Sequence, residues 1–189
     1  SARFANALVA LDVKPGDRVA VQVEKSIEAL MLYLGTIRAG AIFLPLNTAY
    51  TPAEVEYFLG DAEPAVFVCD PAKAEALKSF ADKAGAKLET LGVGTGSLLD
   101  KANAASGEFR DVARGADDLA AILYTSGTTG RSKGAMLSHD NLASNALALV
   151  DYWRFSKDDV LLHALPIFHT HGLFVATNTI LLAGASMIL

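Results

Sequence analysis

Short apolar runs along the chain alternate with stretches in which apolar residues recur every three or four positions. The runs have the length and the Val- and Leu-rich content of buried β-strands. Five such strands are predicted, over residues 18–23, 41–46, 65–69, 119–124 and 160–165. The run over 119–124 is almost continuously apolar, as expected for a strand that is buried on both faces of a sheet.

Helical spacing fills the intervals between these strands. Residues 1–11 place Phe4, Leu8 and Leu11 on one face of a predicted helix, and residues 141–152 are also helix-like. Strands that alternate with helices of this length predict βαβ crossovers and a largely parallel sheet covered on both sides. The sequence therefore predicts an α/β fold.

Local start and stop signals support several of the helices. Ser26 can cap a helix that begins at the next residue. Thr51 and Glu54 have capping-box spacing around a proline at the first helical position, and Gly60 is expected to end that helix. Residues 92–115 are rich in Gly, Ala, Ser and Asp and are predicted to form a surface excursion.

The composition excludes several classes of protein. The chain has 189 residues, of which 52% are hydrophobic and 20% charged, so it can build a core and is not expected to be disordered. It carries 21 acidic and 16 basic residues, a net charge of -5, which argues against non-specific binding to nucleic acid or to an anionic membrane. The single cysteine, Cys69, cannot form an internal disulfide, which favours a reducing, cytoplasmic setting.

The residues that follow Asp159 contain no Asp, Glu, Lys or Arg, so a membrane span has to be considered. A spanning helix needs roughly 20 predominantly apolar residues in succession. Here Pro166, Gly172 and Gly184 interrupt the stretch, together with two histidines. We therefore expect a buried strand, loop and helix and no membrane span.

The segment 124–134 combines three glycines with several hydroxyl side chains and Lys133. Glycines allow successive backbone N–H groups to turn towards one centre, hydroxyls add neutral donors, and a lysine adds a positive charge suited to a polyphosphate. The alternative is an exposed turn, because Ser and Gly are common turn residues. The P-loop NTPase pattern is not met, since Arg131 and Ser132 separate Gly130 from Lys133, and the dinucleotide-binding pattern is also absent.

The same segment resembles the signature of the adenylate-forming superfamily, which includes acyl-CoA synthetases, luciferases and the adenylation domains of peptide synthetases. Further matches to the family's motifs occur in the same order along nearly the whole chain, at residues 35–41, 45–47, 117–120, 136–142 and 165–169. The resemblance implies parallel βαβ layers of the large N-terminal domain. It also implies that residues 1–189 are part of that AMP-binding domain, with the rest of it and a small C-terminal domain lying outside this chain.

The resemblance implies that a carboxylic acid is joined to AMP, with release of pyrophosphate, before transfer to a thiol. The cofactors would be ATP, Mg²⁺ and coenzyme A, and the partners a small carboxylic acid and CoA. The β- and γ-phosphates of ATP would be held by Thr125, Ser126, Gly127, Thr128, Thr129, Gly130 and Lys133. No residue is assigned to a metal, and the 189 residues alone are predicted to lack ligase activity.

His169 falls on the family's pocket position for the acyl carboxylate and is the residue assigned to catalysis, although a lone histidine beside Phe168 could instead be a core residue. A second histidine, His171, stands directly before Gly-Leu. This arrangement resembles the one in malonyl-CoA synthetases and their oxalyl-CoA relatives. His171 is assigned, with His169, to binding of the substrate. The alternative interpretation is that His171 is only a residue at the start of a helix. A dicarboxylate also calls for an arginine, and none follows Arg154.

Two other functions stay open at this point. One is an adenylation domain that loads an amino acid onto a carrier protein, although such domains usually lack the His-x-His-Gly run. The other is a non-catalytic scaffold of the same fold, for which the hydroxyl-rich loop and its lysine would be unnecessary.

Overall fold

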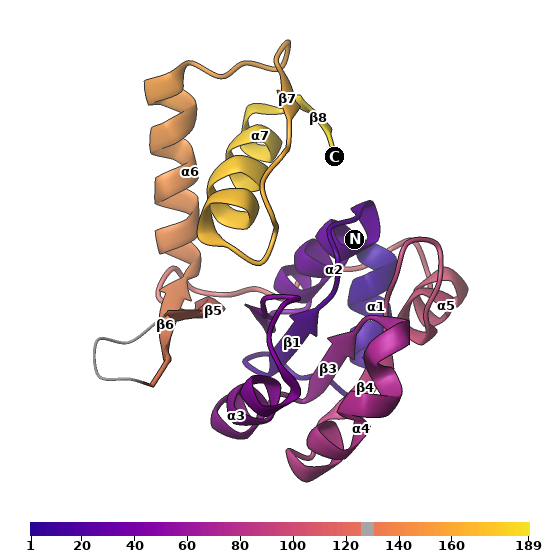
Figure 1. The fold of residues 1–189 in the computed structure, drawn as a ribbon. Helices are drawn as coiled ribbons and strands as arrows, with labels where there is room; N and C mark the ends of the chain where they lie inside the picture. Colours follow the sequence, from indigo (N-terminus) through magenta and orange to yellow (C-terminus); the bar gives the residue numbers. More distant parts are fainter. Residues whose placement is uncertain (126–130) are drawn as a thin grey trace. The chain divides into compact units, whose positions relative to one another are not determined.

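The computed structural model describes residues 1–125 and 131–189, and it divides into two compact units, 1–114 and 115–189 (Figure 1). In the 1–114 unit, β1 pairs in parallel with β2 on one side and with β3 on the other, and β3 pairs in parallel with β4. The strands are β1 (Arg18–Gln22), β2 (Ile42–Pro45), β3 (Val66–Cys69) and β4 (Lys87–Thr90). Every residue of β2 and β3 is buried, which is typical of a parallel sheet covered on both faces.

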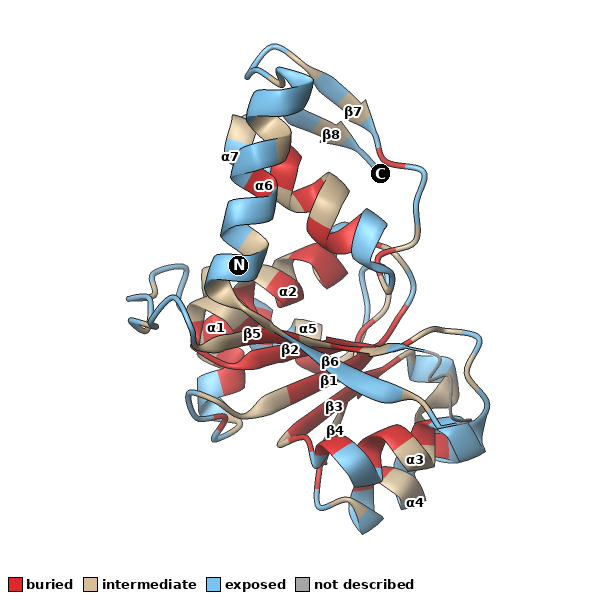
Figure 2. Cartoon of the chain, turned by 90° about the vertical axis from the view of Figure 1, so that its left-hand side faces the viewer, coloured by how far each residue is buried: buried red, intermediate tan, exposed pale blue. Residues whose placement is uncertain are grey.

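Helices cover both faces of this sheet. Figure 2 shows α1, α2 and α5 on one face and α3 and α4 on the other. The helices are α1 (Ala2–Ala10), α2 (Ile27–Arg38), α3 (Pro52–Ala62), α4 (Ala74–Lys83) and α5 (Ser97–Ala104), with a short 3-10 turn, η1 (Pro71–Lys73), before α4. The α/β fold predicted from the alternation of apolar runs and helical spacing is confirmed.

The predicted helix starts are present as hydrogen-bonded caps. The Ser26 hydroxyl accepts from the Ala29 N–H at 3.1 Å. Thr51 and Glu54 form a complete capping box, in which the Thr51 N–H donates to the Glu54 carboxylate at 2.8 Å. The prediction that Gly60 ends α3 is wrong: the helix continues to Ala62, and Glu63 ends it with a left-handed φ of 45°.

The predicted surface excursion over 92–115 is also partly wrong, because it contains α5. This helix buries Leu98 completely and leaves Ala102 1% exposed. It is joined to β4 through the buried Glu89, whose carboxylate accepts from Ser97 Oγ at 2.5 Å and from Lys101 Nζ at 2.9 Å. Two buried positions in a segment rich in small residues give too weak a periodic pattern to predict a helix.

Helices α1 and α2 approach each other closely at Gly35. A Cβ atom on Gly35 would lie 2.7 Å from the Cβ atom of Phe4 and 3.0 Å from the backbone nitrogen of Ala5. Glycine at this point of α2 therefore allows the backbone of α1 to pack directly against it.

The 115–189 unit begins with an antiparallel pair of strands, β5 (Leu119–Thr125) and β6 (Lys133–Ser138). Ser138 caps α6 (His139–Trp153), so the strand leads directly into the helix. Strands β7 (Val160–Leu162) and β8 (Ser186–Ile188) form a parallel pair. Between them lie a π-helical segment, η2 (His171–Thr177), and α7 (Asn178–Ala183).

Two features of this unit differ from the predictions. The strand expected over 160–165 ends at Leu162, and it is not buried as expected, since Val160 is 61% exposed and Leu162 is 72% exposed. Leu162, Leu182 and Ile188 are at least half exposed. None of the helices within the described ranges has the combination of length and apolar content that a bilayer span requires.

Candidate functional site

The β5–β6 pair brings the two ends of the predicted phosphate loop together. Thr125, the last residue of β5, is the cross-strand partner of Lys133, the first residue of β6. The Thr125 hydroxyl donates to the backbone carbonyl of Lys133 at 3.5 Å, and both residues are exposed. The other predicted phosphate-binding residues, Ser126, Gly127, Thr128, Thr129 and Gly130, lie outside the described residues.

The chemistry of this pair suits an anionic ligand. An exposed hydroxyl and an exposed ammonium group stand at the two ends of one short connection, so a phosphate group held there could meet a neutral donor and a positive charge. Within the described ranges there is no cluster of three or more His, Cys, Asp or Glu side chains able to hold a metal ion.

The second part of the candidate site is the segment that carries His169 and His171. Both histidines are exposed, and the His169 ring lies against the Phe168 ring with their centroids 4.6 Å apart. The carbonyl of His169 accepts from the Leu173 N–H at 3.0 Å, which starts the helical turn. An exposed imidazole at the beginning of a helix is available to donate a hydrogen bond to a carboxylate.

Gly172 makes the tight bend between these histidines and the helix possible. A Cβ atom on Gly172 would lie 2.0 Å from the carbonyl oxygen of Pro166 and 2.8 Å from its carbonyl carbon. No side chain larger than hydrogen fits at that distance without moving the backbone. The bend that presents His169 and His171 thus requires glycine at position 172.

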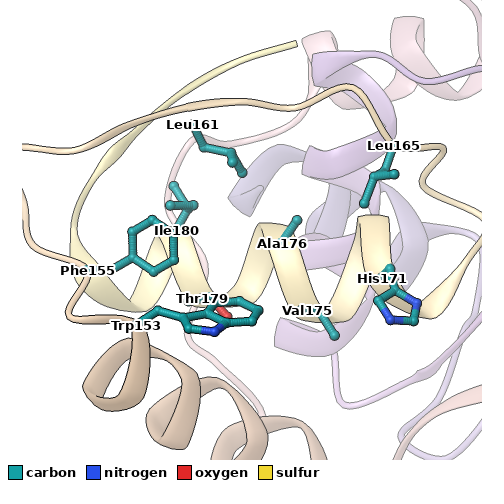
Figure 3. A pocket seen from close by; sticks show the side chains of 9 residues that line it. All are labelled: Trp153, Phe155, Leu161, Leu165, His171, Val175, Ala176, Thr179 and Ile180. Atoms are coloured by element: carbon teal, nitrogen blue, oxygen red, sulfur yellow. The ribbon is translucent and has the colours of Figure 1, made fainter.

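His171 also borders an apolar cavity of about 230 Å³ (Figure 3). Figure 3 shows His171 and Leu165 at one end of it, and Trp153 and Phe155 at the other. Leu161, Val175, Ala176, Thr179 and Ile180 complete the lining. Thr179 is 1% exposed, and its hydroxyl has no hydrogen-bond partner among the residues that the structure describes. His169 is not part of this lining, so the two histidines have different surroundings.

A third histidine, His163, has contacts that its position in the sequence does not predict. His163 lies within the strand predicted over residues 160–165, but it follows β7, is 2% exposed, and has its Nε2 atom 2.8 Å from the carbonyl oxygen of Gly172. The Thr177 hydroxyl donates to the same carbonyl at 2.9 Å. A polar residue inside a predicted apolar strand was the available signal, but its partners could not be inferred from spacing.

Comparison with known proteins places this geometry in a family. The family model described as AMP-binding enzyme matches residues 1–189. The chain belongs to the AMP-binding enzymes. Its fold is that of the N-terminal part of adenylate-forming enzymes: ATP-bound MatB from Rhodopseudomonas palustris is 66% identical, with a TM-score of 0.97, and is matched over 100% of this chain.

The relatives of this AMP-binding enzyme include several CoA ligases. A probable CoA ligase, CCL9, from Humulus lupulus is 33% identical over 98% of this chain, and a malonate–CoA ligase from Arabidopsis thaliana is 32% identical over 85% of it. The chain spans 38% of the MatB chain and 36% and 27% of the two ligases. It thus corresponds to between about a quarter and two fifths of the length of these proteins.

Proposed function

We propose that this AMP-binding chain is the N-terminal part of an acyl-CoA synthetase that activates a small carboxylic acid, with malonate as the substrate. The observation that carries the proposal is the match of the whole chain, at 66% identity, to a protein whose structure contains ATP. In the proposed reaction an acid oxygen attacks the α-phosphorus of ATP and pyrophosphate leaves. The sulfur of CoA then attacks the acyl carbon, and AMP leaves.

The proposed role of the β5–β6 connection is to hold the leaving pyrophosphate. Thr125 and Lys133 would contribute a hydroxyl and an ammonium group to the β- and γ-phosphates, together with Ser126, Gly127, Thr128, Thr129 and Gly130 of the connection. Charge grows on the departing phosphates as the α-phosphorus bond breaks, so the Lys133 ammonium acts most strongly at that stage. When bound with ATP, Mg²⁺ supplies further neutralisation of phosphate charge.

The proposed acid-binding groups are the two exposed imidazoles. His169 would donate a hydrogen bond to the reacting carboxylate and hold it for in-line attack. His171 would serve the second carboxylate of malonate, and the malonate–CoA ligases of Arabidopsis thaliana and Bos taurus among the relatives favour this acid. The apolar wall beside His171 contains no cationic side chain, so an arginine for the second carboxylate would have to come from elsewhere in the protein.

We also propose that this reaction takes place in the cytoplasm. The support is the single cysteine, Cys69, which is fully buried and has no cysteine partner in the chain. Proteins that function in oxidising compartments more often carry paired cysteines.

The test is acid-dependent pyrophosphate exchange by the complete enzyme. Malonate is compared with oxalate, acetate, a longer monocarboxylate and an amino acid, each with ATP and Mg²⁺. Exchange that is fastest with malonate, followed by formation of malonyl-CoA when CoA is added, is the expected result. Exchange only with an amino acid, or none with any acid, would contradict the proposal.

A further inference from the structure

His163 is buried directly behind the bend that carries the two exposed histidines. Its side chain is 2% exposed, while its backbone N–H donates to the carbonyl of Ile188 in β8 at 2.8 Å. The ring therefore projects from a backbone that is hydrogen-bonded to β8, outside the 166–172 bend.

The imidazole makes a directional contact with the bend. Its Nε2 atom lies 2.8 Å from the Gly172 carbonyl oxygen, which can only accept, so Nε2 carries the proton and donates. The Thr177 hydroxyl donates to the same oxygen at 2.9 Å and lies 3.2 Å from Nε2. Two donors from different parts of the chain thus converge on one backbone oxygen.

Gly172 is the residue through which this contact reaches the exposed histidines. It follows His171 directly, and a Cβ atom on it would lie 2.0 Å from the carbonyl oxygen of Pro166. The neighbouring Leu173 N–H donates to the carbonyl of His169. In the described part of the chain, the bend is consequently packed closely at Pro166 and hydrogen-bonded at His169 and at the Gly172 carbonyl, and the contact from His163 comes from a side chain outside residues 166–177.

We propose that His163 is a positioning residue for acid activation: by holding the Gly172 carbonyl, it fixes where His169 and His171 present their imidazoles. This inference rests on the proposed function for its effect on catalysis. His163 does not touch the acid. It acts through Gly172, and because a displacement of about 1 Å can cost as much as a hundredfold in rate, loss of the contact weakens use of the acid.

A buried histidine could also serve only to fill space, and two substitutions separate these roles. His163→Leu replaces the imidazole by an apolar side chain of similar size and so removes the hydrogen-bond donor. His163→Gln can place its amide nitrogen near the Nε2 position and so restore a donor. Thr177→Val removes the second donor to the same oxygen while keeping the shape of the side chain. Ser138→Ala is the control, because it weakens the cap of α6 in the same unit without touching residues 163–177.

Each variant is made in the complete enzyme, and the KM values for malonate and ATP are measured separately. His163→Leu is expected to raise the KM for malonate about tenfold and to leave the KM for ATP within about twofold. His163→Gln should recover most of this loss, and Thr177→Val should give a smaller rise. Ser138→Ala should lower the melting temperature with both KM values unchanged.

Imidazole NMR resonances of the same enzymes give a readout that is independent of turnover. His163→Leu is expected to move the His169 and His171 signals, and His163→Gln to return them towards their original positions. Unchanged signals and an unchanged KM for malonate in His163→Leu would overturn the proposal. If His163→Leu does not fold, unchanged signals in both His163→Gln and Thr177→Val, with equal KM values for malonate, overturn it.

Failure of the proposed function would look different. In that case the unsubstituted enzyme shows no pyrophosphate exchange with any acid. The inferred effect of His163 on acid activation is then also wrong. The resonances of His169 and His171 would still decide whether His163 sets the position of the bend.

Discussion

The backbone of Gly172 lies against the carbonyl of Pro166 so closely that a methyl group on Gly172 would stand 2.0 Å from that oxygen. Gly172→Ala is therefore expected to destabilise the protein by about 3 kcal/mol, the upper part of the usual range for overpacking. The free energy of unfolding from denaturant titration checks this. Gly115→Ala is the control, since a Cβ atom there meets nothing closer than 3.5 Å. Equal stability of the two variants would contradict the observed packing.

The contact between α1 and α2 gives a second comparison, between two glycines that both lie within helices. Gly35→Ala would bring a Cβ atom to 2.7 Å from that of Phe4, and we expect a loss of about 1–3 kcal/mol. Gly60→Ala in α3 meets nothing within 4 Å and should stabilise the protein by about 0.5–1 kcal/mol, because alanine is the better helix former. Thermal unfolding of both variants should show shifts of opposite sign. Two shifts in the same direction would argue against the close approach of α1 and α2.

The position of Lys133 at the first residue of β6, opposite Thr125, leads to a kinetic prediction for the complete enzyme. Lys133→Ala should slow adenylate formation about a hundredfold, because in the proposed reaction the lysine stabilises charge on the departing pyrophosphate. Thioester formation from a supplied acyl-adenylate should change little, because pyrophosphate has already left. The two half-reactions are measured separately by single-turnover kinetics.

The control for Lys133 is Arg131→Ala, which removes a positive charge from the same connection at a position with no assigned role. Its two half-reactions are expected to stay near those of the unsubstituted enzyme. If Lys133→Ala slows both half-reactions equally, the assignment of Lys133 to pyrophosphate release is wrong.

The thiol of Cys69 provides a prediction on pH. Burial raises the pKa of Cys69 to about 11, with a smaller contribution from the neighbouring Asp70 carboxylate. A raised pKa in the folded state means that the thiol stabilises the fold fully below its unfolded pKa, and that this stability is lost as the pH rises from about 9 towards 11. At pH 8 the native protein should react very slowly with an aromatic disulfide reagent, and rapidly after unfolding in guanidinium chloride.

Cys69→Ala gives the background for that measurement, because the chain contains no other cysteine. Rapid modification of the native protein at pH 8 would show that the thiol is accessible, contrary to its burial at the end of β3.

The parts of the fold that could be predicted are those in which the signal is local. The buried strands β1, β2 and β3 are apolar runs, and α2 and α3 begin at side chains that cap them, Ser26 and Thr51. Strand β4 was not predicted, because Lys87 and Glu89 break its apolar pattern. Glu89 is buried only because Ser97 and Lys101, from a later helix, supply its hydrogen bonds. Such compensation depends on tertiary contacts and leaves no trace in the local sequence.

The candidate site also has some features that the local sequence predicts and others that depend on tertiary contacts. Thr125 and Lys133 were predicted to belong to one loop because both lie in a single short motif, and the structure makes them cross-strand partners. The apolar surroundings of His171 could not be predicted, because Trp153 and Phe155 lie outside the histidine segment and reach it through the packing of α6 against η2 and α7. The contact between His163 and Gly172 depends on a bend whose geometry is set by the approach of Gly172 to Pro166.

Because Thr125 pairs with Lys133 across the strands, the length of the connection between them can be changed to affect activity without much effect on the stability of the fold. The strand ladder already holds the two ends of the 126–132 connection at a set spacing, and the entropic cost of closing a loop grows only slowly with its length, by about 0.6 kcal/mol for each doubling. An inserted residue in that connection should therefore hardly change the melting temperature measured by calorimetry. Under the proposed function, the activity of such length variants would measure how strictly a bound nucleotide constrains this stretch, separately from any effect on folding.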